Sequence, residues 1–224
     1  MQYIIDHIPK TTPHNRRSGI VMIPESITIH STGNPTSTSM NELKWLTSPQ
    51  NKGSASWHIV VDEKEAIEAI PLREAARHAG DGNGPGNRTS IGIEICESGN
   101  RAKTLQNAVE LVADLLKQRN WGTDKLKRHF DRSGKDCPRI LRENNWAGWE
   151  KFKAEVENKL APIPAINIIF NGRRANHVTA RLHNGRTEVS VSGQWVGIRD
   201  IVNLIPDATL SWDEKTKTAD VKIP

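Results

Sequence analysis

Strand-like segments recur through the first 160 residues, and this recurrence constrains the fold more than any other feature of the chain. Each segment is short and rich in β-branched residues, as expected of strands in a sheet. The segments are SITIHS at 26–31, SWHIVVD at 56–62, EAIEAI at 65–70 and SIGIEIC at 90–96. Because helical patterns are interleaved with them, the chain predicts an α/β or α+β domain.

The helical patterns are spaced so that each can cover a sheet. Over 103–119, apolar residues recur at i, i+3, i+4 and i+7 and form one core-facing stripe. A last helix near 146–160 carries Trp149, Phe152, Val156 and Leu160 on one face. A shorter helix is predicted to begin at a capping box of Ser39 and Glu42 and to run through Leu46.

A proline-containing segment, residues 161–165, is predicted to be a linker between a domain at 1–160 and a second at 166–224. In the second, Asn-Gly pairs at 171–172 and 184–185 predict hairpin turns. A helix over 195–204 and a hairpin in TLSWDEKTKTADVKI complete a small β-rich domain with one short helix. This domain resembles those named from the amino-terminal region of copper amine oxidases, which implies a cell-wall-binding domain.

Composition excludes some functions and leaves others open. No apolar run approaches the ~20 residues of a membrane span, so membrane insertion is not expected. The amino terminus lacks the apolar centre of a secretory signal, which predicts synthesis in a reducing cytosol and argues against a Cys96–Cys137 disulfide. The net charge of +5 suits a polyanionic partner, but no nucleic-acid motif accompanies it, so no nucleic acid is expected.

The segment KRHFDRSGKDCP brings His129 and Cys137 within one polar stretch, and both residue types bind zinc. His30, at the end of a predicted strand, is the best third candidate ligand. Spacing alone leaves open that His30 is a packed histidine and Cys137 a plain thiol. In IGIEIC, alternation places the three isoleucines on one face of the strand and Glu94 on the other. A carboxylate there either faces solvent or, if buried, is paired or has a function.

Four ordered segments carry a family resemblance: SITIHSTGN, SWHIVVDE, HAGDGNGPGNRTSIGIEICE and RHFDRSGKDCP. Together they resemble the zinc-dependent N-acetylmuramoyl-L-alanine amidases of the type-2 amidase and peptidoglycan-recognition family, particularly phage endolysins and prophage autolysins of Gram-positive hosts. The resemblance covers about residues 1–160. It implies a mixed central β-sheet flanked by helices.

The resemblance also implies site residues. It makes His30, His129 and Cys137 the ligands of a Zn²⁺ cofactor, and Glu94 and Lys135 the catalytic side chains. Three further residues are predicted to bind substrate: Trp57, where many relatives have tyrosine, together with His78 and Asn87.

The implied function is hydrolysis of the amide bond between N-acetylmuramic acid and L-alanine in bacterial peptidoglycan, which lyses the wall. The alternative is a recognition protein of the same fold that binds muropeptides without cutting them. Expected partners are peptidoglycan and anionic wall polymers. The chain is expected to be a monomer that is made in the host cytoplasm and reaches the wall after holin-type release or cell lysis.

Overall fold

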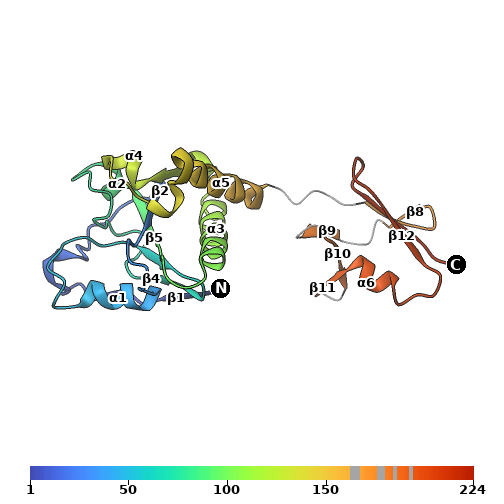
Figure 1. Ribbon diagram of the computed structural model, residues 1–224, viewed down its shortest axis with the longest axis horizontal. Coiled ribbons are helices and arrows are strands. Elements are labelled where there is room, and N and C mark those ends of the chain that lie inside the picture. Colours follow the sequence, from blue (N-terminus) through green and yellow to red (C-terminus); the bar gives the residue numbers. More distant parts are fainter. Residues whose placement is uncertain (162–166, 176–179, 184–185, 192–193) are drawn as a thin grey trace. The chain divides into compact units, whose positions relative to one another are not determined.

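The computed structural model describes the chain except for residues 162–166, 176–179, 184–185 and 192–193 (Figure 1). The chain divides into two compact units, Met1–Leu160 and Ala161–Pro224, and each is described by itself. The linker predicted at 161–165 lies, apart from Ala161, outside the described residues.

A mixed sheet forms the centre of the first unit, as predicted. Its strand order is β1-β4-β3-β5-β2-β6. The strands are β1 (Gln2–Ile5), β2 (Ser26–Ser31), β3 (Ile59–Val61), β4 (Glu65–Glu68), β5 (Ser90–Ile95) and β6 (Leu126–Arg128). Strands β3 and β4 pair antiparallel, while β1–β4, β3–β5, β5–β2 and β2–β6 pair parallel.

The sequence patterns did not predict the two edge strands, β1 and β6. The strand predicted at 56–62 is also longer than β3, which covers Ile59–Val61. Strand β6 has three residues, of which only Leu126 is buried, so it carries no alternation to recognise. Strand β1 is mostly exposed. Edge strands are held by backbone pairing on one side, and such pairing leaves little trace in the side chains.

The helices of this unit are α1 (Ser39–Thr47), α2 (Pro85–Arg88), α3 (Arg101–Lys117), α4 (His129–Ser133) and α5 (Glu143–Leu160). Short 3-10 turns lie at Pro13–Asn15, Thr123–Lys125 and Arg139–Leu141. The regular part of α5 begins after Trp146, because the residues from Asn144 to Trp146 have positive φ.

The predicted capping box of α1 is wrong by one residue. Thr38 is the N-cap, and its side chain accepts the N–H of Asn41 at 3.3 Å. Ser39 lies inside the helix, where its hydroxyl donates to Asp62 at 2.8 Å. A buried carboxylate partner therefore outweighs the local capping pattern.

Both faces of the sheet are buried, because alternate strand residues enter two different apolar clusters. On one face, Ile27, Ile29, Ile91, Ile93 and Ile95 pack with residues of α3 and α5. On the other, Val60, Ile67 and Cys96 pack with Leu43 and Leu46 of α1 and with Trp57. Each fully buried isoleucine contributes ~1.5–3 kcal/mol. No helix in the described part of the chain is long and apolar enough to cross a membrane.

In the second unit, the described residues form two small sheets and one helix. One sheet has the order β11-β10-β9 and the other β12-β13-β7-β8. The elements are β7 (Asn167–Phe170), β8 (Arg173–Arg174), β9 (Ala180–His183), β10 (Arg186–Val191), β11 (Gln194–Gly197), α6 (Ile198–Val202), β12 (Thr209–Asp213) and β13 (Thr218–Lys222).

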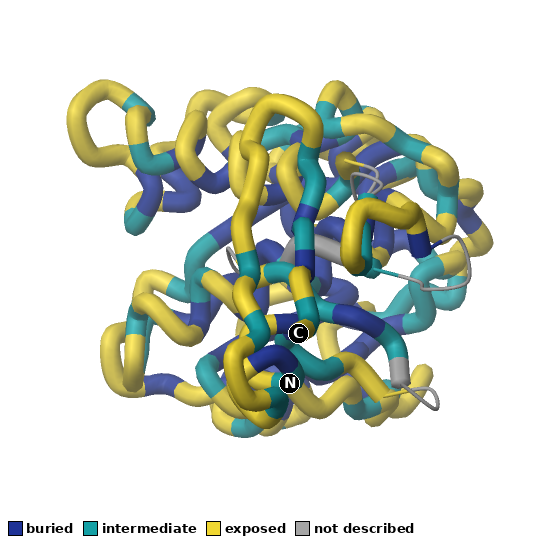
Figure 2. Tube along the Cα trace, turned by 90° about the vertical axis from the view of Figure 1, so that its right-hand side faces the viewer, coloured by how far each residue is buried: buried dark blue, intermediate teal, exposed yellow. Residues whose placement is uncertain are grey.

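The turn predicted at 171–172 is confirmed: Asn171 and Gly172 both have positive φ and join antiparallel strands. The final hairpin, β12–β13, is also confirmed. In Figure 2 one of its strands is largely exposed while the other alternates between buried and half-buried residues. The helix predicted over 195–204 is shorter, because residues 195–197 pair in β11. The pair at 184–185 lies outside the described residues.

Candidate metal centre and active site

Three adjacent parallel strands end at the same edge of the central sheet, and each delivers one polar side chain there. His30 on β2 lies in register with Glu94 on β5. On the other side of β2, strand β6 ends at Arg128, and His129 begins α4 directly after it. Carboxyl ends of parallel strands are where α/β proteins commonly bind ligands.

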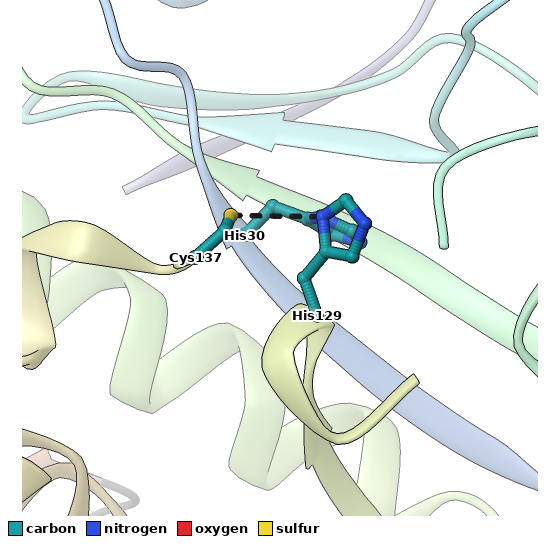
Figure 3. A group of neighbouring side chains, drawn as sticks. All are labelled: His30, His129 and Cys137. Atoms are coloured by element: carbon teal, nitrogen blue, oxygen red, sulfur yellow. Dashed lines mark hydrogen bonds between the residues drawn. The ribbon is translucent and has the colours of Figure 1, made fainter. Parts of the chain in front are cut away.

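The structure brings the three predicted ligands together. His30 Nδ1 lies 2.9 Å from His129 Nδ1 and 3.9 Å from Cys137 Sγ (Figure 3). All three ligand atoms lie within 4.8 Å of one another, and all three residues are buried. Figure 3 shows them arriving from three separate segments: a strand, a short helix and the loop that follows it.

A hydrogen-bond chain fixes the protonation of His30. The carbonyl of Ser90 can only accept, so His78 Nε2, 3.1 Å away, carries a proton. In neutral His78 the other nitrogen is then an acceptor, and it lies 3.0 Å from His30 Nε2. His30 therefore donates from Nε2 and presents a bare Nδ1 to the cluster, as metal-binding histidines with a supporting partner do.

A similar arrangement holds the other two ligands. His129 hydrogen-bonds the backbone of Ala79, whose N–H is donated to Asn87 Oδ1, which leaves the Ala79 carbonyl as the acceptor. The chain then turns back after α4, and the carbonyl of Cys137 accepts the N–H of Phe130 at 3.0 Å. The sulfur of Cys137 also lies 3.4 Å from the backbone N–H of Ser31.

The chemistry of this donor set fits a zinc ion. Burial lowers the pKa of His30 well below its usual value and that of His129 to about 4, so both rings are neutral, with bare Nδ1 atoms facing one another. Burial raises the pKa of Cys137 to about 12. A bound cation would favour the thiolate form of Cys137. It would also relieve the repulsion between the lone pairs of the two Nδ1 atoms of His30 and His129.

Glu94 lies beside the ligands with an unused oxygen. Its Oε1 is 4.0 Å from His30 Nδ1, and because His30 is neutral this contact is not an ion pair. Its Oε2 is buried and has no hydrogen-bond partner in the part of the chain that the structure describes. Burial, and secondarily the charge of Glu42, raise the pKa of Glu94 to about 8. Such a group can exchange a proton near neutral pH.

Lys135 lies on the exposed loop between α4 and Cys137. Its positive charge lowers the pKa of His30, of His129 and of Glu94, so the ammonium group acts on the whole cluster. Lys135 is thus an exposed cationic side chain that is close enough to the ligands to affect them electrostatically.

The three residues predicted to bind substrate have other surroundings. Trp57 is 9% exposed and packs in the apolar cluster with α1. His78 supports His30 from below, and Asn87 accepts the backbone N–H groups of both His78 and Ala79 at 2.8 Å. In the described structure Trp57 thus packs in the core and the other two make hydrogen bonds around His30, while their contact with substrate stays a prediction.

A glycine two residues before Glu94, Gly92, predicts a close approach by another group, but the sequence did not identify that group as His78. A Cβ at Gly92 would lie 2.6 Å from the ring of His78, so a side chain there would displace that support. The backbone N–H of Gly92 donates to His58 Nδ1 at 2.9 Å. This hydrogen bond orients the buried ring of His58 as well. The signal was a glycine in mid-strand, which often marks a close approach by another group.

Comparisons with known proteins agree with this geometry. A family model described as N-acetylmuramoyl-L-alanine amidase matches residues 21–140, a range that contains all three candidate ligands. Two curated Bacillus subtilis (strain 168) proteins are similar: the amidase XlyB is 45% identical over 145 residues, and the amidase CwlA is 47% identical over 145 residues.

These matches cover 62% of this chain but 44% of XlyB and 51% of CwlA, so the chain spans about half the length of these relatives. A solved structure titled as the catalytic domain of XlyA superposes with a TM-score of 0.64 at 39% identity, covering 70% of this chain and 99% of that one. A structure titled PlyL superposes with a TM-score of 0.62 at 34% identity, covering 70% of this chain and 98% of that one.

Proposed function

The chain belongs to the family of N-acetylmuramoyl-L-alanine amidases, and from that premise we propose that it is a zinc-dependent hydrolase of bacterial peptidoglycan. The bond cut is the amide between the lactyl group of N-acetylmuramic acid and L-alanine. The observation that carries the proposal is the gathering of His30, His129 and Cys137 within 4.8 Å, beside Glu94.

A zinc ion held by two imidazoles and one thiolate would lower the pKa of a water toward ~7 and polarise the scissile carbonyl. Glu94 would accept the proton of the attacking water, a role supported by its Oε2, which has no hydrogen-bond partner among the described residues. It would then pass that proton to the amide nitrogen of the leaving L-alanine. A general base that titrates near the working pH suits both steps.

Lys135 would stabilise the negative charge that develops on the carbonyl oxygen during attack. The ammonium group of Lys135 is exposed, so the free protein does not bear the cost of burying this charge. Its charge already affects the pKa of Glu94, which shows that it lies near the cluster. A single donor of this kind commonly contributes ~2.7–4 kcal/mol.

For the second unit we propose wall binding, as its resemblance to the amine-oxidase-type domains implies. The proposed partner is peptidoglycan or an anionic wall polymer. Such a polymer would complement the net charge of +5 of the whole chain. A monomeric state, and release to the wall through a holin-type pore or by lysis, stay predictions from the sequence.

Product analysis tests the proposed reaction. Purified walls are incubated with the protein, and the new chain ends are identified by mass spectrometry. Amidase action releases stem peptides that begin with L-alanine and creates no new reducing sugar ends. New reducing ends would instead identify a glycosidase, and an absence of new ends would support the non-catalytic alternative.

A further inference from the structure

The three candidate ligands are not held in the same way. His30 belongs to strand β2 and His129 begins helix α4, so regular structure fixes both of them. Cys137 lies in the loop that follows α4. The position of its sulfur therefore depends on contacts between this loop and the rest of the domain.

The carboxylate of Glu97 joins the chain just beyond His30 to the chain just beyond Cys137. Glu97 follows strand β5, and its side chain is only 5% exposed. Its Oε1 accepts the backbone N–H of Gly33, three residues after His30, at 2.9 Å. Arg139, two residues after Cys137, donates from Nε to Oε1 at 2.9 Å and from Nη2 to Oε2 at 2.6 Å. One buried carboxylate thus connects the two segments.

Ser31 extends this connection to the sulfur. The Ser31 hydroxyl accepts the backbone N–H of Arg139 at 3.2 Å, and the same side chain is hydrogen-bonded to Glu97. The backbone N–H of Ser31 lies 3.4 Å from Cys137 Sγ. A continuous set of contacts therefore runs from Glu97, through Arg139 and Ser31, to the candidate ligand.

The Glu97 carboxylate is ionised in this arrangement. Burial alone would raise the pKa of Glu97, but hydrogen bonds from Arg139, Ser31 and the backbone of Gly33 outweigh burial and lower it below its ordinary value. The contact with Arg139 is therefore a charge-assisted, bidentate pair, which fixes geometry more strictly than a single hydrogen bond between neutral groups.

We propose that Glu97 is a positioning residue of the metal centre, whose carboxylate holds Cys137 Sγ in place beside His30 by way of Arg139 and Ser31. The inference rests on the proposed function, since it takes His30 and Cys137 as zinc ligands. Residues that support metal ligands commonly change metal affinity by ~10–100-fold when they are replaced. Because Glu97 acts through other residues, we expect an effect at the lower end of this range.

The test measures zinc affinity by competition with a chromogenic chelator, which requires no hydrolysis. Glu97→Gln and Arg139→Gln should each weaken zinc binding by about tenfold. The double variant should also lose about tenfold, rather than about a hundredfold, because both side chains act through one contact. It also tests the inference without leaving a buried charge unpaired. Arg142→Gln, which breaks an exposed ion pair with Asp136 on the same loop, is the matched control and should keep its affinity.

The sign of the Arg139→Gln effect separates positioning from a direct effect of charge. When zinc replaces the thiol proton of Cys137, the site gains one positive charge, which a nearby arginine opposes and a nearby glutamate favours. Charge alone would therefore raise zinc affinity in Arg139→Gln and lower it in Glu97→Gln. Positioning lowers it in both.

Higher affinity in Arg139→Gln, unchanged affinity in Glu97→Gln, a hundredfold loss in the double variant, or an equal loss in Arg142→Gln would each overturn the inference. Zinc binding that is equal in all variants overturns this inference alone and leaves the proposed metal centre intact. An unmodified chain that binds no zinc overturns the proposed metal centre, and this inference with it.

Discussion

The two units of the chain differ in where they keep their polar side chains. In the first unit, four histidines are buried, at positions 30, 58, 78 and 129, and they are held by hydrogen bonds. In the second unit, the residues described as buried are all apolar. Its ion pairs lie at the surface, as for Arg186 and Asp200, whose side chains are 64% and 57% exposed.

The difference indicates how the two units divide their work. Buried and oriented polar groups act strongly on a substrate because water does not screen them. Exposed pairs contribute little to stability and can exchange partners. This contrast supports the proposed roles, which are catalysis for the first unit and wall binding for the second. The predictions below test this division, beginning with the change of largest expected effect.

Replacing Cys137 with serine should abolish wall lysis and remove the zinc. A hydroxyl is not deprotonated as readily as a thiol, so the third ligand is lost. Elemental analysis after dialysis and a turbidity assay on purified walls measure both. Cys96→Ser changes the other buried thiol, which packs in an apolar cluster, and should keep its zinc. Retention of one zinc per chain by Cys137→Ser would refute the ligand assignment.

Replacing Glu94 with glutamine should reduce turnover by ~10²–10⁴ while zinc remains bound. Glutamine is nearly isosteric but cannot accept the proton. Cleavage of a soluble muropeptide under saturating conditions gives kcat, and elemental analysis gives the zinc content. Near wild-type turnover would remove Glu94 from the mechanism.

Replacing His78 with phenylalanine should weaken zinc binding by ~10–100-fold. Phenylalanine fills the space over Gly92 but cannot accept the proton of His30 Nε2, so that ring loses its fixed orientation. Competition with a chromogenic chelator measures the affinity. His14→Phe, at an exposed histidine, is the control and should show none of the loss. Equal affinities in both variants would make His78 a packing residue only.

Ending the chain at Leu160 should have the smallest effect on chemistry. The first unit keeps its own sheet and the helix α5 that closes its core, so it should fold. Cleavage of a soluble muropeptide should stay within about twofold, while clearance of whole cells should slow by about tenfold, because the tether no longer raises the local concentration. Equal losses on both substrates would show that the second unit supports the catalytic fold.

Much of the central fold was predictable because its strands alternate cleanly. In SITIHS and SIGIEI the isoleucines fix which face is buried, and that choice places His30 and Glu94 on the same opposite face. Spacing alone did not establish that these residues meet His129 and Cys137, which lie 99 and 107 residues after His30 in the chain. That required the family resemblance or the structure.

The supporting residues could not be predicted from the sequence. His78 and Asn87 flank a glycine-rich segment, where a polar side chain suggests contact with a ligand, and Asn87 lies in the short helix α2. Their hydrogen bonds depend on how this segment folds against β2 and β5, and local sequence does not encode this. Trp57 packs in an apolar cluster, and its contact with substrate stays a prediction.

The most direct test of the account is a zinc titration of the metal-free protein. Zinc is removed with a chelator, returned in measured portions, and amide cleavage is followed by the release of stem peptides that begin with L-alanine. We expect no cleavage in the metal-free protein and a linear recovery that ends at one zinc per chain. Full cleavage without metal, or recovery that does not follow zinc content, would contradict the proposed site.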